Sequence, residues 1–284
     1  MSIQTFGGIN PAFADPQTAA IYLQPILYDG TSTWGKGADK GFEAFMDAAA
    51  NMELYDIETD SEVYRKGIHL LPDLAGFESA EAMFQATYSQ AKKLLETGKF
   101  LTFFGGEHSI SIGLIKAHYE QIEDLTVLQI DAHADLRPEY LGTPYNHACA
   151  LYDASQHANL IQVGIRSMEL EESQHMDRSK TWFAQDMHGH DRWMKESIDK
   201  MGEKVYITFD LDAFDPGVLP GTGTPEPGGL GWYETLAYLK KVFRERDVIG
   251  FDLVELAPIE GHSASQFAAA KLYYKMLSYK FFQS

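Results

Sequence analysis

The chain has 284 residues, of which 45% are hydrophobic and 23% charged, so it can bury a sizeable core and is neither disordered nor fibrous. Its 41 acidic and 23 basic side chains give a formal net charge of −18, which argues against nucleic acid or an anionic membrane surface as a partner, since both require a basic surface. Metal cations or a positively charged small molecule fit this charge better, although an acidic surface can also serve solubility alone.

The composition and the first residues indicate where the protein works. Cys149 is the only cysteine, so no internal disulfide can form. The N-terminal residues lack the basic start and apolar run of a signal peptide, and no apolar stretch reaches the ~20 residues that cross a bilayer. We therefore predict a cytoplasmic protein without a membrane span.

Short apolar runs alternate with longer amphipathic stretches along the chain. The predicted strands, in chain order, are residues 25–28, 54–57, 67–71, 100–104, 126–131, 159–164, 204–210 and 247–254. The predicted helices are residues 41–50, 80–97, 110–120, 147–153, 169–176, 192–201, 233–244 and 263–278. Apolar runs rich in Val, Ile and Phe suit strands buried on both faces. The alternation predicts right-handed βαβ crossovers and a mainly parallel sheet, whose ligands bind beyond the carboxyl ends of the strands.

Two predicted strands end in polar clusters with a spacing of two residues. The run 126–130 stops in Asp131, His133 and Asp135, and the run 205–209 stops in Asp210 and Asp212. Side chains two apart in an extended chain point the same way, so each cluster is expected to converge on one point.

Two further strand ends carry the same kinds of side chain. Gly105 and Gly106 follow the run 100–104 and permit a tight turn that brings His108 to the head of the next helix, and the run 248–254 ends in Glu255. A single aspartate at a strand end is usually a turn or cap residue, and a lone histidine is usually structural. The joint occurrence of these clusters favours a functional site.

Several carboxylates gathered in one cleft would repel one another, and their pKa values would rise, unless cations neutralised them. Two imidazoles together with oxygen ligands suit Mn(II)-like or Zn-like ions better than Ca or Mg. The number of ligands is enough for two ions that share bridging carboxylates, at the ~3.5–4 Å separation typical of such pairs. The sequence therefore predicts a metal site with enough ligands for two ions.

The segments that carry these residues resemble those of the ureohydrolase (arginase/agmatinase) family. The matching stretches are Gly105-Gly-Glu-His-Ser109, Asp131-Ala-His-Ala-Asp135, Phe209-Asp-Leu-Asp-Ala-Phe-Asp-Pro216 with the following residues 221–228, and Phe251-Asp-Leu-Val-Glu-Leu-Ala-Pro258. Residues 25–31 are a weaker echo of the opening segment of the family. The family more often has Asp where this chain has Glu107, which is not expected to be a ligand.

The resemblance implies two Mn(II) ions and assigns their ligands. His108, Asp131, Asp135 and Asp210 look like the ligands of one ion, and Asp131, His133, Asp210 and Asp212 look like those of the other. Asp131 and Asp210 then bridge the two ions. The resemblance also implies one domain over residues 1–284, folded as a three-layer α/β/α sandwich with a mainly parallel, about eight-stranded sheet and assembled as a homo-oligomer, a trimer or hexamer.

The activity that the family implies is hydrolysis of a guanidinium to urea and an amine. A guanidinium carbon is a poor electrophile, so the reaction needs a strong nucleophile, which a metal-activated water supplies. We predict that Asp135 orients this nucleophile, that Glu255 accepts paired N–H bonds from the guanidinium, and that His147 passes a proton to the leaving amine. For His147, a role at a helix start or behind the metal ligands is the alternative.

The loop after the aspartate cluster indicates which guanidine is the substrate. Residues 136–146 lack the Asn/Ser/Thr-rich stretch with which arginases grip the α-carboxylate of arginine, and they resemble the agmatinase type, Asp-Leu-Arg-x-x-Tyr-x-Gly followed by His-Ala. Agmatine lacks the carboxylate and carries two positive charges, so acidic walls would help to bind it. We expect a small cationic guanidine as the partner, and hydrolysis of agmatine to putrescine and urea.

Other interpretations remain open. Arginine or guanidinobutyrate is an alternative substrate for the same chemistry. A two-metal phosphoesterase would share an Asp-x-His start but normally needs a Gly-Asn-His segment, which the sequence lacks. A non-catalytic relative with an assembly role is a further alternative. The loop of residues 29–40 is expected to overhang the cleft, and His188 and His190 are interpreted as part of a surface loop.

Overall fold

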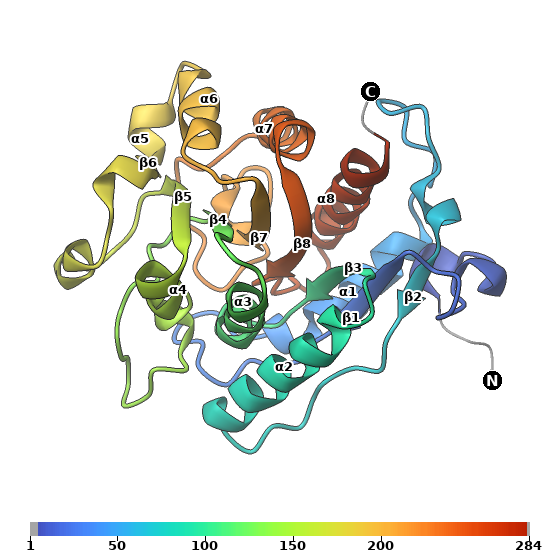
Figure 1. Cartoon of the computed structure of the whole chain (residues 1–284), viewed down its shortest axis with the longest axis horizontal. Helices are drawn as coiled ribbons and strands as arrows, with labels where there is room; N and C mark the ends of the chain where they lie inside the picture. The colour runs from blue at the N-terminus through green and yellow to red at the C-terminus, as the bar shows by residue number, and fades with distance from the viewer. Residues whose placement is uncertain (1–4, 283–284) are drawn as a thin grey trace.

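The computed structural model describes residues 5–282 of the chain, and one parallel sheet of eight strands forms its centre (Figure 1). The strands run in the order β2-β1-β3-β8-β7-β4-β5-β6, and all neighbouring pairs are parallel. Their bounds are β1 Ile21–Pro25, β2 Ile68–Leu70, β3 Phe100–Phe104, β4 Thr126–Ile130, β5 Asn159–Ile165, β6 Thr181–Phe183, β7 Lys204–Asp210 and β8 Asp247–Val254.

Helices cover both faces of this sheet and complete the predicted α/β fold. On one face α1, α6, α7 and α8 pack around the larger hydrophobic cluster, and on the other α2, α3 and α4 pack around a second cluster (Figure 1). The helices are α1 Gly41–Ala50, α2 Ala80–Leu95, α3 Ile110–Gln121, α4 Tyr152–His157, α5 Ala184–Met187, α6 Arg192–Asp199, α7 Trp232–Glu245 and α8 Ala264–Phe281. No helix among residues 5–282 combines the length and the apolar character of a membrane span.

The central strands are mostly apolar because they are buried on both faces. In β4 all five residues are buried, and its apolar side chains alternate between the two clusters: Leu128 and Ile130 belong to the larger one and Val127 to the smaller. Successive side chains of a strand point to opposite faces, so a strand between two helical layers favours apolar residues at both odd and even positions. The predictions for β3, β7 and β8 are confirmed to the residue for this reason.

Two strand predictions differ from the structure at the edges of the fold. Residues 54–57 form no strand, because Asp56 accepts the backbone N–H groups of Glu58 and Thr59 and closes a turn from which Ile57 projects, 85% exposed. The first strand is Ile21–Pro25 rather than residues 25–28. The edge strand β6 was not predicted from the sequence. It has three residues, and within the described part of the chain it pairs with β5 alone.

The predicted helices at 147–153 and 169–176 are also wrong in kind. His147–Cys149 is a single 3-10 turn, capped by the side chain of Asn146, and α4 begins only at Tyr152. Residues Leu170–Gln174 likewise form a 3-10 helix rather than an α-helix. The short helix α5, which has four residues, was not predicted from the sequence.

The order of the strands brings the predicted site residues together. They follow β3, β4, β7 and β8, and these four strands are neighbours in the middle of the sheet, in the order β3-β8-β7-β4. Parallel strands place all four carboxyl ends at the same edge. The fold therefore positions one site at the centre of that edge.

Candidate metal centre

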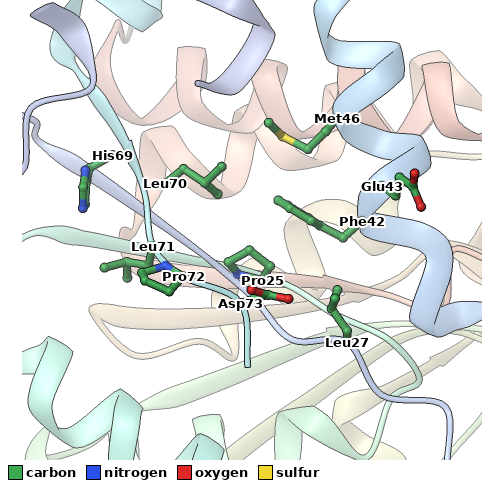
Figure 2. Close-up of a pocket in the computed structure, with 10 residues that line it drawn as sticks. All are labelled: Pro25, Leu27, Phe42, Glu43, Met46, His69, Leu70, Leu71, Pro72 and Asp73. Atoms are coloured by element: carbon green, nitrogen blue, oxygen red, sulfur yellow. The ribbon is translucent and has the colours of Figure 1, made fainter. Parts of the chain in front are cut away.

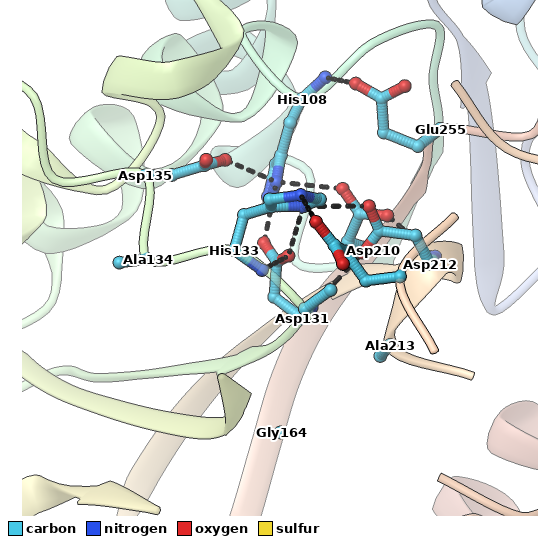
Figure 3. Close-up of polar contacts among 12 residues, drawn as sticks. His108, Asp131, His133, Ala134, Asp135, Gly164, Asp210, Asp212, Ala213 and Glu255 are labelled. Carbon is cyan, nitrogen blue, oxygen red and sulfur yellow. Dashed lines mark hydrogen bonds and ion pairs between the residues drawn. The ribbon is translucent and has the colours of Figure 1, made fainter. Parts of the chain in front are cut away.

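Two histidines and four aspartates converge beyond the carboxyl ends of the central strands, with Glu255 beside them (Figure 3). His108 precedes α3, the Asp131–Asp135 segment follows β4, and Asp210 is the last residue of β7. Asp212 lies in the 3-10 turn Leu211–Ala213. The structure thus brings together all six residues predicted to bind metal.

The first group surrounds the ring of His108. Its Nδ1 lies 3.1 Å from Oδ2 of Asp131, 3.1 Å from Oδ2 of Asp135 and 3.2 Å from Oδ2 of Asp210. These four side chains are buried, and Nδ1 has no hydrogen-bond partner among the described residues. A buried imidazole nitrogen that faces three carboxylate oxygens is an arrangement that a cation completes.

The second group surrounds the ring of His133. Its Nδ1 lies 2.9 Å from Oδ2 of Asp212 and 3.8 Å from Oδ1 of Asp131. Asp131 therefore offers one oxygen to each group, as the predicted bridging role requires. Three donor atoms in each group are close enough to share one metal ion, those of His108, Asp131 and Asp135 in the first and those of Asp131, His133 and Asp212 in the second.

The electrostatics of the cluster also call for positive charge. Burial, with the charges of Asp212 and Asp131, raises the pKa of Asp210 well above its usual range. Burial and the Asp131 charge raise the pKa of Asp135 to about 7. Burial lowers the pKa of His133, but the charge of Asp212 outweighs that effect and raises it to about 11. In the metal-free protein, bound protons supply the positive charge that neutralises the cluster. Divalent ions would supply the same charge, so the residues present fit a pair of metal ions.

A hydrogen-bond chain behind His108 fixes the orientation of its ring. Nε2 of His108 lies 2.9 Å from Oγ1 of Thr208, and this hydroxyl donates to Oδ1 of Asp252 at 2.6 Å. Because the hydroxyl proton goes to the carboxylate, Thr208 accepts Nε2–H of His108. Nδ1 then presents its lone pair to the carboxylate cluster, which is the tautomer that a metal ligand needs.

Thr208 and Asp252 were not predicted from the sequence. Both are wholly buried polar residues inside apolar strands, and they pair across β7 and β8. A polar residue inside a run of buried apolar residues is the signal that could have identified them, since such a residue requires a partner.

Thr208→Val is expected to weaken metal binding while leaving every predicted ligand in place. Valine has the shape of threonine but cannot accept Nε2–H of His108, so the ring loses the bond that orients it. Loss of a partner of this kind typically lowers metal affinity about 10–100-fold. Competition with a calibrated chelator measures the affinity, and Thr208→Ser, which keeps the hydroxyl, is the matched control. Equal affinities of the valine variant and the parent would remove Thr208 from the site.

Glu255 is held at the edge of the cluster by its own backbone and by His108. Its backbone N–H donates to the carbonyl of Gly106 at 2.8 Å, and its Oε1 accepts the backbone N–H of His108 at 2.8 Å. Glu255 adopts a φ of 67° and Asp135 a φ of 53°, in the left-handed region that non-glycine residues rarely occupy. Strain of this kind is characteristic of functional sites, where the surrounding structure maintains it.

The Gly105-Gly106 turn allows the backbone to pass close to the segment after β1. A Cβ atom on Gly106 would lie 1.7 Å from the carbonyl oxygen of Tyr28, so no other residue fits. The close approach lets Glu107 N–H donate to that carbonyl at 2.9 Å. The predicted tight turn is confirmed, and it joins the His108 loop to the beginning of the loop of residues 29–40.

His147 lies outside the two groups of candidate metal ligands and contacts the loop of residues 29–40 instead. Its backbone N–H donates to Oγ1 of Thr31 at 3.0 Å, and its Nδ1 lies 3.2 Å from the same oxygen. Burial lowers the pKa of His147 to about 4, so the imidazole is neutral at pH 7. The structure places His188 and His190 on the surface after α5, where they were predicted.

A separate groove lies away from the metal ligands. It has a volume of about 760 Å³ and opens between α1 and the β1–β2 edge of the sheet (Figure 2). Its walls are mainly apolar, with Phe42 and Met46 on α1 and Leu70 on β2, and they also include the polar side chains of Glu43 and His69. None of the predicted site residues lines this groove.

Comparison with known proteins bears on the function of the site. Residues 19–278 match the model of the Arginase family. The N(1)-aminopropylagmatine ureohydrolase of Synechocystis sp. is 38% identical over 273 residues, covering 92% of this chain and 89% of that protein. The agmatinase of Pyrococcus horikoshii is 31% identical, with 92% of each chain covered. The crystal structure of the agmatine ureohydrolase of Thermoplasma volcanium superposes with a TM-score of 0.88 at 28% identity, covering 99% of this chain and 95% of that one.

The family model matches residues 19–278, which include the three segments that carry the candidate ligands and the segment that carries Glu255. Enzymes of the matched family depend on two metal ions, in agreement with the two groups of ligands that share Asp131. The chain belongs to the arginase family and is a ureohydrolase.

Proposed function

We propose that this enzyme uses two Mn(II) ions to hydrolyse the guanidinium of an agmatine-type amine, with release of urea. The observation that carries the proposal is the pair of buried ligand groups that share Asp131, with Glu255 fixed beside them. His108, Asp131, Asp135 and Asp210 are the proposed ligands of one ion, and Asp131, His133, Asp210 and Asp212 those of the other. Bound divalent ions would lower the pKa of a shared water from about 15.7 to about 7 and so supply hydroxide at neutral pH.

Three residues in or beside the ligand groups bind the guanidinium, orient the water and transfer a proton. Oε2 of Glu255 accepts no hydrogen bond from residues 5–282, and Oε1 has a second lone pair, so the carboxylate can accept two N–H groups from the guanidinium. Asp135, which lies at the edge of the first group, orients the attacking water. His147 is partly buried and neutral at pH 7, and it passes a proton to the leaving amine.

The loop after the aspartate cluster supports a substrate that lacks an α-carboxylate. Arg137 is the only basic residue of positions 136–146, and its guanidinium is already engaged. Its guanidinium nitrogens lie 3.6 Å from a carboxylate oxygen of Glu169 and 3.8 Å from one of Glu172. The guanidinium also lies over the ring of Tyr140, with Cζ 4.3 Å from the ring centroid. This loop therefore offers no free cation for the carboxylate of arginine.

Two substrates of this type differ in length. Agmatine is the substrate predicted from the sequence, and its products are putrescine and urea. N1-aminopropylagmatine is the second candidate, because relatives that bear its name reach 38% and 35% identity, whereas the agmatinase relative of Pyrococcus reaches 31%. Both molecules present the same guanidinium to Glu255 and differ only in the amine at the far end.

A comparative assay of urea release tests the proposal. The Mn(II)-loaded enzyme receives agmatine, N1-aminopropylagmatine, arginine and 4-guanidinobutyrate in parallel, and kcat/KM is measured for each. We expect both agmatine-type substrates to exceed both carboxylate-bearing substrates by at least about 10³-fold, since a carboxylate would be buried without a partner. Fastest turnover of arginine would contradict the proposal, and the ratio between the first two substrates selects the physiological one.

Metal exchange completes this assay. Stripping the enzyme with a chelator is expected to abolish urea release, and Mn(II) is expected to restore it more fully than Mg(II), which prefers oxygen ligands alone. The cytoplasmic location and the assembly into a trimer or hexamer remain predictions from the sequence.

A further inference from the structure

A hydrogen-bond chain connects buried Glu107 through Thr31 to His147. Oγ1 of Thr31 lies 2.8 Å from Oε1 of Glu107 and 3.2 Å from Nδ1 of His147. The same oxygen accepts the backbone N–H of His147 at 3.0 Å. The metal ligands do not take part in these bonds, so the chain constitutes a separate feature of the site.

The direction of the bond between Thr31 and Glu107 follows from the other donors around the carboxylate. Glu107 is wholly buried, and both of its oxygens face backbone N–H groups: Thr31 N lies 3.2 Å from Oε1 and Ser109 N lies 2.9 Å from Oε2. A carboxylate surrounded by donors in this way acts as an acceptor. The hydroxyl of Thr31 therefore gives its single proton to Glu107.

The free lone pair of the Thr31 hydroxyl determines which nitrogen of His147 carries the proton. A hydroxyl has one proton and two lone pairs, and one lone pair already accepts the backbone N–H of His147. The other lone pair faces Nδ1, so this bond forms only when Nδ1 carries the proton. A neutral imidazole with its proton on Nδ1 has a lone pair on Nε2, and Nε2 has no hydrogen-bond partner among residues 5–282.

We propose that Thr31 is a positioning residue: its hydroxyl, anchored by Glu107, holds His147 in the Nδ1–H tautomer and keeps Nε2 free to accept and return a proton. The proposal rests on the proposed function, because it concerns the proton that the leaving amine requires. Without the hydroxyl, the ring can exchange to the Nε2–H tautomer or rotate, and the lone pair then faces away from the reaction.

The test compares Thr31→Val, which keeps the shape and removes the hydroxyl, with Thr31→Ser, which keeps the hydroxyl. Nitrogen NMR of histidine-labelled protein, with diamagnetic Zn(II) in place of Mn(II), reads the tautomer directly. The His147 signals are assigned by their loss in His147→Gln. We expect a protonated Nδ1 and an unprotonated Nε2 in the parent and the serine variant, and loss of this pattern in the valine variant.

Kinetics of the Mn(II)-loaded enzymes provide the second measurement. We expect Thr31→Val to lower kcat about 10–100-fold with little change in KM, because the hydroxyl acts on proton transfer and not on guanidinium binding, and we expect Thr31→Ser to restore most of the rate. A protonated Nε2 in the parent, an unchanged kcat in the valine variant, or a serine variant as slow as valine would each overturn the proposal. If no guanidine releases urea, the proposed function fails, while the NMR measurement still decides the tautomer.

Discussion

Replacing Asp210 with asparagine is expected to abolish urea release and metal binding, and at the same time to raise the melting temperature of the metal-free protein. Asp210 is a predicted bridging ligand, and its charge is buried next to those of Asp131 and Asp212, which raises its pKa. Asparagine keeps the size of the side chain and is neutral without binding a proton, so folding of the metal-free protein no longer has to protonate a buried carboxylate at this position or oppose its repulsion.

The hydrogen bonds of the cluster favour the same outcome. Oδ1 of Asp210 accepts the backbone N–H of Asp212 at 2.8 Å, and an asparagine amide oxygen can do the same. Oδ2 lies 3.2 Å from Nδ1 of His108, whose lone pair is otherwise unpartnered, so the amide NH2 gains an acceptor there. The substitution thus stabilises the metal-free protein but removes the stability that metal binding would add. A trade-off of this kind between stability and function is common at functional sites.

Differential scanning fluorimetry with and without Mn(II), together with metal analysis and the urea assay, measures these effects. For the parent, one ion at 100 times its dissociation constant adds about 2.7 kcal/mol of stability, and Asp210→Asn is expected to lose this gain. Asp47→Asn, on the exposed side of α1, removes the same charge far from the site and is expected to behave like the parent. A variant that still gained stability from Mn(II) would show that Asp210 is not a ligand.

Much of the fold and of the candidate site could be predicted because their signals are local. The acidic clusters stand at the ends of β4, which is fully buried, and of β7, which is buried after its first residue, so a change from mainly apolar to acidic residues marks both the end of the strand and the site. At the edge of the sheet this logic fails, since β6 has three residues and one neighbour and therefore little burial to leave a pattern. Residues 54–57 have the apolar pattern of a strand, but the side chain of Asp56 accepts the backbone N–H of Glu58 and closes a turn there.

The supporting contacts of the site could not be predicted, because they depend on register and on distant segments. Thr208 meets Asp252 as its partner across β7 and β8, and a shift of one residue would separate them. Thr31 and His147 are 116 residues apart. Sequence patterns therefore identify the residues that a reaction needs, whereas the structure adds the residues that orient them.

Glu255→Gln is expected to reduce kcat/KM strongly while leaving metal binding intact. The amide oxygen of glutamine can still accept the backbone N–H of His108, the bond that now ends on Oε1, so the loop and the unusual φ of 67° remain supported. What is lost is the negative charge that, in the proposed function, faces the guanidinium. Removing one partner of a buried, hydrogen-bonded charge pair costs about 2–5 kcal/mol, which corresponds to a decrease in kcat/KM of roughly 30- to 5,000-fold.

The distribution of this loss between kcat and KM locates the role of Glu255. A charge that binds the guanidinium equally in the ground and transition states raises KM when it is removed, whereas a charge that acts only in the transition state lowers kcat. Glu139→Gln, an exposed change in the loop of residues 136–146, alters the net charge equally and is expected to leave both constants within about twofold of the parent, because exposed charges are screened. A Glu255→Gln enzyme that lost its metal would show that the charge of Glu255 supports metal binding, because glutamine keeps the hydrogen bond to His108. Full activity would place the guanidinium elsewhere.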